Sequence, residues 1–522
     1  SFLIATVDKF AALPWIGQAG ALLGKVDRAD TEGFYGPSEP GRGRPLPLPL
    51  QPPDLVIQDE LHLISGPLGT MVGLYETALD ALCERRTGDV AVRPKIVAST
   101  ATVRRAERQI QALFGRTAVE IFPPPGPNRR DSFFARTIDD PDQARLYLGV
   151  ASQGRSLKVV LLRTYLALMA AAQRQWIAAG GPRDANNPAD PYMTLLGYFN
   201  SLRELGGSRR IVEDEVNARL AAYGERRRVG EASAGFMNRK IDDLPQELTS
   251  RVRTSEVAET KRRLGLGFAD KERVDVALAT NMISVGLDIV RLGLMVVLGQ
   301  PKTASEYIQA TSRVGRDPTR RPGLVVALLN VHRPRDRSHY ERFAAWHESF
   351  YRAVEATSVT PFSPPARERG LAGVAVALAR HLVPAMSPPR SAVQAAALRT
   401  QLDVVADVLA ERAARHDPTG DATAAEALRQ RVRAEVHRLL DVWAALAHER
   451  QQLGEGLQYQ REAGSDQPLL HQPGDPELSK ISPAFARFTA ARSLRDVEPS
   501  VGLWVRTPDG FLVDVGAAEE AT

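Results

Sequence analysis

Two adjacent carboxylates and a histidine follow an apolar run in DLVIQDELHLISG at 54–66. Acidic side chains are rarely buried without a partner, so Asp59 and Glu60 are expected where a buried strand emerges into a site. There, one carboxylate could orient Mg²⁺ through water while its neighbour polarises an attacking water, as nucleotide hydrolysis requires. An acidic pair at a strand end also commonly caps the next helix, so the pair and His62 alone leave both interpretations open.

Hydroxyl groups end the next apolar strand along the chain, in KIVASTAT at 95–102. If this strand lies in the same sheet, Ser99, Thr100 and Thr102 reach the edge at which the acidic pair is expected. Serine and threonine at a strand-to-helix junction are also frequent helix N-caps, so this motif too has a purely structural interpretation.

Two further motifs come later in the chain. ATNMISVGLDIVRLG at 279–293 follows a predicted strand and places Gly286 and Asp288 in a turn where the backbone can approach a ligand closely. In QATSRVGR at 309–316, a helix would put Gln309 and Arg313 one turn apart and Arg316 on the same face. Guanidinium groups suit phosphate oxygens, although either arginine could equally form a salt bridge.

The elements that must position these residues form two α/β stretches. From 1 to 122, apolar strands (FLIAT, DLVIQ, KIVAST) alternate with helical stretches (TMVGLYETALDALCERR, VRRAERQIQALFG), which predicts a parallel sheet covered by helices. A Pro/Gly-rich segment at about 36–53 is interpreted as a surface insertion. The proline-rich start of 123–150 indicates a stiff connector.

The second α/β stretch, 151–335, contains strand candidates YMTLLGYF, VDVALAT, LGLMVVLG and GLVVALL. From 336 to 522 the composition turns to Ala, Leu, Arg and Glu at helical spacing, which predicts a mostly α-helical C-terminal region. The predicted fold class is therefore α/β, with two such domains followed by helices.

Composition limits the class of protein. The chain has 522 residues, 43% of them hydrophobic and 25% charged, and lacks any apolar run of about 20 residues, so a multidomain soluble protein without membrane contact is expected. Its single cysteine, Cys83, excludes an intrachain disulfide framework and suits the cytoplasm. A net charge of +5 with arginine clusters permits nucleic-acid binding without requiring it.

Taken in order, ATVDKF, DELH, STAT, YFNSL, ATNMISVGLD and QATSRVGR resemble motifs Ib, II, III, IV, V and VI of a superfamily 2 helicase of the DExH type. The resemblance covers roughly residues 1 to 330. Longer stretches, among them DELHLISGPLGTMVGLYE and ASEYIQATSRVGR, are similar to the large helicase subunit of DISARM-type anti-phage defence systems. The resemblance implies two RecA-like domains with ATP hydrolysed between them.

The resemblance also implies roles for individual residues. In the first domain Asp59 would hold Mg²⁺ through water, Glu60 would act on the attacking water, and His62 would couple the domains through the Ser99, Thr100 and Thr102 motif or Gln309. In the second, Arg313 and Arg316 would act as arginine fingers and Gln309 would face the γ-phosphate region. Asp288 would approach the ATP ribose, and Gly286 in the same turn would belong to the cofactor-binding residues. The residues implied in nucleic-acid backbone contacts are Thr6, Lys9, Asn200, Ser201 and Thr280.

One departure from the family pattern matters. The phosphate loop GxxxxGK(S/T) should precede ATVDKF and does not occur in the 522 residues, since GALLGKV at 20–26 has the wrong spacing and lacks the hydroxyl. We therefore expect a C-terminal fragment that cannot hydrolyse ATP alone, with the loop in an upstream segment. The predicted function is an ATP-dependent helicase or translocase acting on DNA in phage defence, aided by a companion subunit; the alternative is a non-catalytic nucleic-acid-binding scaffold.

Overall fold

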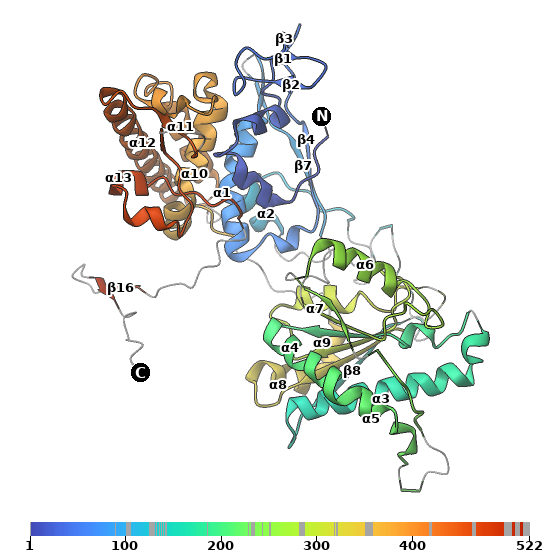
Figure 1. Ribbon diagram of the computed structural model, residues 1–522. Helices are drawn as coiled ribbons and strands as arrows, with labels where there is room; N and C mark the ends of the chain where they lie inside the picture. The colour runs from blue at the N-terminus through green and yellow to red at the C-terminus, as the bar shows by residue number, and fades with distance from the viewer. Residues whose placement is uncertain are drawn as a thin grey trace. The chain divides into compact units, whose positions relative to one another are not determined.

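The structure is a computed structural model and describes most of the chain. The described residues are 2–88, 90–100, 106–124, 131, 133, 134, 136, 138, 140, 144–184, 186–227, 229, 230, 235–242, 244–249, 252–280, 288–317, 319, 322–349, 359–416, 420–461, 466–494, 504–506 and 512–514. They form two compact units (Figure 1): unit 1 comprises Ser1–Glu120 and Ala356–Thr522, and unit 2 comprises Ile121–Glu355. No helix in these ranges is long and apolar enough to cross a membrane.

Unit 2 is built on a parallel sheet of six strands in the order β10-β11-β9-β12-β13-β8. The strands are β8 (Leu146–Ala151), β9 (Leu195–Phe199), β10 (Gln246–Leu248), β11 (Val276–Ala279), β12 (Leu294–Leu298) and β13 (Leu324–Leu329). Residues of β9, β11 and β12 are buried throughout, as expected for strands covered on both faces. The four strands predicted in this stretch are thus confirmed, while β8 and β10 were not predicted.

Helices cover both faces of this sheet. They are α3 (Leu157–Ala178), α4 (Leu202–Ile211), α5 (Asn217–Leu220), α6 (Thr254–Leu264), α7 (Ala304–Thr311), α8 (Pro334–Glu341) and α9 (Phe343–Glu348), with a π-helical turn at Val212–Val216. One apolar core joins Tyr165 of α3 and Leu205 of α4 to the sheet, and a second joins Leu264 of α6 and Tyr307 of α7 to the opposite face. This arrangement confirms the predicted α/β fold class.

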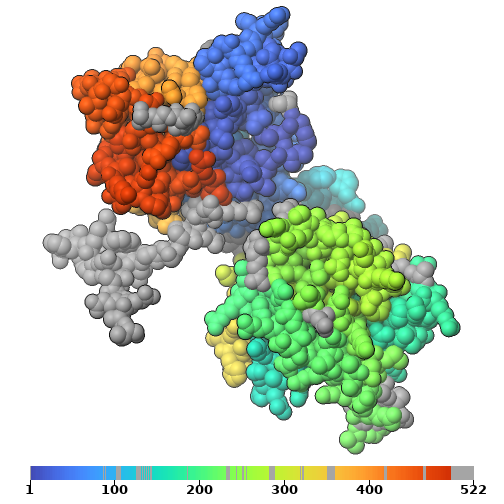
Figure 2. Space-filling view, in the orientation of Figure 1, coloured from blue at the N-terminus to red at the C-terminus, as the bar shows by residue number. Residues whose placement is uncertain are grey.

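Unit 1 contains a short parallel sheet, in which β4 (Leu55–Gln58) pairs with β7 (Lys95–Ala98), and a set of longer helices. The helices are α1 (Gly66–Leu82), α2 (Ala106–Phe114), α10 (Pro364–Leu382), α11 (Asp403–His416), α12 (Ala422–Gln452) and α13 (Pro483–Ala486). One apolar core includes Leu74 of α1, Leu113 of α2, Val374 of α10 and Trp443 of α12. The helical region after residue 356 therefore shares its core with the first 120 residues, and Figure 2 shows it packed directly against them.

Smaller elements complete unit 1. They are β1 (Arg28–Ala29), β2 (Phe34–Tyr35), β3 (Arg44–Pro45), β5 (Arg85–Thr87), β6 (Val90–Val92), β14 (Leu457–Gln458), β15 (Gln467–Pro468), β16 (Trp504–Arg506) and β17 (Leu512–Asp514), with 3₁₀ helices such as η1 (Val7–Ala12). The prediction of a strand at FLIAT is wrong: residues 2–6 pair with no described strand, and Phe2 and Ile4 are 88% and 84% exposed. An apolar run becomes a strand only when a neighbour accepts its hydrogen bonds.

Candidate functional site

The structure brings the acidic pair and the hydroxyl motif together at the carboxyl ends of β4 and β7. Gln58 lies opposite Ala98, so Asp59 and Ser99 follow as neighbours, and the Ser99 amide donates to the Gln58 carbonyl at 2.9 Å. The Ser99 hydroxyl donates to Oδ1 of Asp59. Two segments 40 residues apart in sequence therefore meet as the parallel-strand argument requires.

Glu60 has an unusual backbone conformation. Its φ of 52° and ψ of 47° lie in the left-handed region, and among the described residues it is the one non-glycine residue with a positive φ. Its amide donates to Oδ1 of Asp59 at 2.9 Å, which helps to hold this turn. Such strained residues concentrate at functional sites, so the geometry supports a functional rather than a purely structural interpretation of the pair.

The helix-capping alternative is not supported at this position. The Glu60 side chain makes no capping hydrogen bond, and the next long helix, α1, has Ser65 as its N-cap. The Asp59 carboxylate uses Oδ1 for Ser99 and Glu60, and its Oδ2 makes no hydrogen bond within the described part of the chain. An outer-sphere contact to hydrated Mg²⁺ would therefore suit Oδ2 of Asp59.

His62 connects the two motifs. Its side chain is 6% exposed, and Nδ1 lies 3.2 Å from the Thr100 hydroxyl and 3.4 Å from Oε2 of Glu60. The expected contact from His62 to the hydroxyl motif is present, whereas its role in coupling stays a prediction. Thr102 lies outside the described residues.

Thr6 and Lys9 lie at the start of η1 in the same unit. Thr6 is the residue before η1, its hydroxyl donates to Asp8 at 2.9 Å, and both Thr6 and Lys9 are exposed. They are accessible to a ligand, but nothing in their surroundings indicates which ligand that is.

In unit 2, the residues expected to contact nucleic acid lie at the carboxyl ends of neighbouring strands. Asn200 follows β9 and donates from Nδ2 to the Leu298 carbonyl of β12 at 3.0 Å. Ser201 is the N-cap of α4, with its hydroxyl accepting from the Glu204 amide at 3.3 Å, and Thr280 follows β11 and is buried. The structure therefore brings these three residues to one edge of the sheet.

Asp288 and Arg316 meet nearer the amino ends of β12 and β13. Nη1 of Arg316 donates to Oδ1 of Asp288 in an ion pair. Both residues were expected to face a nucleotide, and the pair shows that their charged groups share one location. Gly286 lies outside the described residues.

The prediction that one helix carries Gln309, Arg313 and Arg316 is wrong. Helix α7 ends at Thr311, so buried Gln309 is helical while the two arginines lie in the turn after it. Gly315 shapes the turn that follows the helix, because its φ is +67° and a Cβ there would lie 2.6 Å from Cα of Gly323. Only glycine fits this conformation and this close approach.

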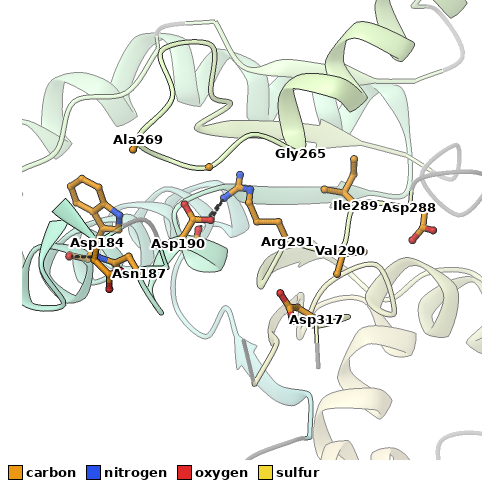
Figure 3. Close-up of a pocket in the computed structure, with 12 residues that line it drawn as sticks. Asp184, Asn187, Asp190, Gly265, Ala269, Asp288, Ile289, Val290, Arg291 and Asp317 are labelled. Atoms are coloured by element: carbon orange, nitrogen blue, oxygen red, sulfur yellow. Dashed lines mark hydrogen bonds and ion pairs between the residues drawn. The ribbon is translucent and has the colours of Figure 1, made fainter. Parts of the chain in front are cut away.

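A cavity of about 530 Å³ opens beside Asp288 (Figure 3). Its lining includes Trp176 and the carboxylates of Asp184, Asp190, Asp288 and Asp317. The Arg291 guanidinium crosses the cavity wall, with Nη1 3.0 Å from Oδ2 of Asp190 and Nη2 2.6 Å from the Thr194 hydroxyl. Because four of its five charged lining side chains are acidic, the cavity is better suited to hydroxyl or cationic groups than to phosphates.

Sequence reasoning missed this cavity and one further residue, Asp336. The Asp336 carboxylate is 1% exposed and accepts the Gln300 and Asn330 amides, each at 3.1 Å, so it ties together the loops after β12 and β13. No local sequence signal identifies this contact. The parts of the chain that the structure describes contain no group of three His, Cys, Asp or Glu side chains able to hold a metal ion directly.

Comparison with known proteins adds to this geometry. The family described as the helicase conserved C-terminal domain matches residues 234–318. The DISARM protein DrmA of Bacillus paralicheniformis is 44% identical over 395 residues, which cover 74% of this chain and 34% of that protein. The chain therefore spans about a third of the length of this relative.

Two solved structures show more distant similarity. The DUF1998 helicase MrfA bound to DNA has a TM-score of 0.39 and 16% identity, covering 62% of this chain and 37% of its own. The helicase Lhr of Mycobacterium smegmatis, bound to single-stranded DNA and AMP-PNP, has a TM-score of 0.40 and 17% identity. The match covers 72% of this chain and 38% of the Lhr chain. These likenesses are too weak to assign an activity, whereas the two sequence matches agree with the motifs: the chain resembles a superfamily 2 helicase and, in particular, DrmA.

Proposed function

We propose that the protein containing this chain is an ATP-dependent helicase or translocase that acts on DNA in phage defence. The observation that carries the proposal is the arrangement at the ends of β4 and β7, where Asp59 bonds to Ser99 and His62 lies between Glu60 and Thr100. The match of 234–318 to a helicase domain and the 44% identity to a DISARM protein support it.

In the proposed hydrolysis each charged side chain has one role. Glu60 accepts a proton from the attacking water, and Nδ1 of His62, 3.4 Å from its Oε2, helps to orient the carboxylate. Asp59 would hold Mg²⁺ through its water shell, and the ion would supply positive charge to the ATP phosphates. Arg313 and Arg316 supply positive charge to the transferring phosphoryl group, with Gln309 beside them and Asp288 near the ribose.

Nucleic acid would be bound through its phosphate backbone. Asn200, Ser201 and Thr280 share one edge of the unit 2 sheet, and Thr6 and Lys9 are exposed in unit 1. Phosphate contacts supply affinity without reading sequence, so the proposed activity is insensitive to base order. We further propose a cytoplasmic location and a companion defence subunit, with which DNA is loaded.

The proposal is tested by ATP hydrolysis in the full-length protein. Turnover is measured without nucleic acid and with single-stranded, duplex and tailed DNA of equal length. We expect at least one DNA to stimulate hydrolysis, and its form to indicate the substrate on which the protein loads. If the protein neither binds nor hydrolyses ATP in the presence of any of these DNAs, the non-catalytic scaffold becomes the better explanation. DNA binding alone should then remain.

A further inference from the structure

The carboxyl edge of the unit 2 sheet carries basic side chains in addition to the uncharged residues predicted to contact nucleic acid. Four strands at this edge lead directly into helices: β8 into α3, β9 into α4, β12 into α7 and β13 into α8. The junctions contain five exposed basic side chains, which we call the basic edge: Arg155, Lys158, Arg203, Lys302 and Arg335.

The charges of the basic edge are not compensated. None of its five side chains forms an ion pair with a carboxylate in the described part of the chain; Arg335 donates to the Gln300 carbonyl at 2.7 Å, which leaves its charge in place. By contrast, Arg333 at the same edge lies 3.1 Å from Glu204. Uncompensated like charges gathered on one edge raise the local potential and attract an anionic partner.

The loops after β9, β12 and β13, which lead to Arg203, Lys302 and Arg335, are held in place. Asp336 receives the Gln300 and Asn330 amides, and Asn200 donates to the Leu298 carbonyl. Gly299, between these groups, has a φ of +74°, and a Cβ there would lie 3.3 Å from Oδ2 of Asp336 and 3.4 Å from Nδ2 of Asn200. A binding surface whose backbone is already fixed loses little backbone conformational entropy when it binds a ligand.

We propose that the basic edge binds successive phosphates of the nucleic-acid backbone, extending the contact surface from β11 and β9 across β12, β13 and β8. This inference rests on the proposed function and adds to it the path of the strand over unit 2. Strands in a sheet lie about 4.8 Å apart, so the four steps from β11 to β8 span about 19 Å.

The basic edge supplies charge but no fixed pattern of donors and acceptors for base edges. Lysine and arginine on loops and first helical turns contact phosphates from any direction, and such contacts position a strand without reading it. The basic edge is therefore expected to bind nucleic acid irrespective of its base sequence, and a single strand is the species that we test.

The test is a fluorescence anisotropy titration of the 522-residue chain with two unrelated single-stranded 20-nucleotide DNAs at several salt concentrations. One variant removes two charges at the start of α3, Arg155→Gln with Lys158→Gln, and a second is Lys302→Gln. The matched control, Arg174→Gln with Arg183→Gln, removes one exposed charge in the last turns of α3, about 25 Å along the helix from Leu157, and a second in the 3₁₀ turn Gly181–Arg183 that follows it. Circular dichroism melting checks that all variants fold.

Removing one phosphate contact to a single strand should reduce the log–log salt slope by about 0.7, which at 0.1 M salt is about a fivefold decrease in affinity. We therefore expect about a 25-fold decrease for the double variant at the basic edge, about fivefold for Lys302→Gln, and less than twofold for the control. If the wild-type chain binds DNA and the edge variants keep its affinity and slope, the inference is overturned while the proposed function stands. If the wild-type chain binds neither DNA, the nucleic-acid contacts of the proposed function fail with it.

Discussion

Asp336→Ala offers a quantitative test of how unit 2 holds its carboxyl edge. The carboxylate is 1% exposed and accepts two backbone amides, Gln300 and Asn330, at 3.1 Å each. A hydrogen bond to a charged group contributes about 1.5–3 kcal/mol, so removing both should lower the free energy of unfolding of unit 2 by about 3–6 kcal/mol. Asp336→Asn keeps the shape and one acceptor oxygen, and should lower it by about half of that.

Hydrogen exchange with mass spectrometry provides a local measurement. Peptides that contain Gln300 and Asn330 should exchange about 30-fold faster or more in Asp336→Ala, because protection falls by about 2 kcal/mol per amide. Asp214→Ala, which alters an exposed carboxylate in the same unit, is the control and should change stability by less than about 0.5 kcal/mol. Wild-type exchange at both amides in Asp336→Ala would refute the role given to this carboxylate.

Three further predictions concern other parts of the chain. Burial raises the pKa of Glu76 from 4.5 to about 7, so the folded chain keeps this proton between those values while the unfolded chain loses it. The free energy of unfolding should therefore fall by roughly 3 kcal/mol as the pH rises through this window, and Glu76→Gln should abolish that part of the pH dependence in urea unfolding; an unchanged pH profile would contradict it. Gly315→Ala should lower the Tm of unit 2 by about 4 °C or more, since strain of about 1–3 kcal/mol is added, whereas Gly206→Ala, where a Cβ meets nothing within 4 Å, should not; equal melting temperatures would exclude the close approach to Gly323 as a constraint. In the full-length protein Arg316→Ala should reduce DNA-stimulated ATP turnover by roughly 10³-fold or more, and turnover at the wild-type level would remove Arg316 from the proposed mechanism.

Much of the fold follows from the sequence because its parallel strands are short apolar runs, and those at the centre of the unit 2 sheet are buried on both faces. β9, β11, β12 and β13 are of this kind, while β4 and β7 are short apolar runs that are only partly buried. The meeting of Asp59 with Ser99 also follows, since parallel strands bring their carboxyl ends to one edge of a sheet.

The remaining features depend on contacts between distant parts of the chain. Helix α7 ends at Thr311, and in the turn beyond it Gly315 lies against Gly323, a contact that no local propensity of these residues records. The Asp190–Arg291 ion pair joins residues 101 positions apart, and the core of unit 1 joins helices from both ends of the chain. Local patterns cannot specify such pairs, because each partner alone is an ordinary polar or apolar residue.

The most direct test of the central claim compares ATP binding with ATP turnover in the full-length protein carrying Glu60→Gln. The amide keeps the size of the side chain but cannot accept the proton of the attacking water, so ATP binding should stay near wild type while DNA-stimulated turnover falls by about 10²-fold or more. Binding is measured with a fluorescent ATP analogue, and turnover by phosphate release in the same preparation. Turnover at the wild-type rate would contradict the account, because the strained Glu60 beside Asp59 and His62 would then have no part in hydrolysis.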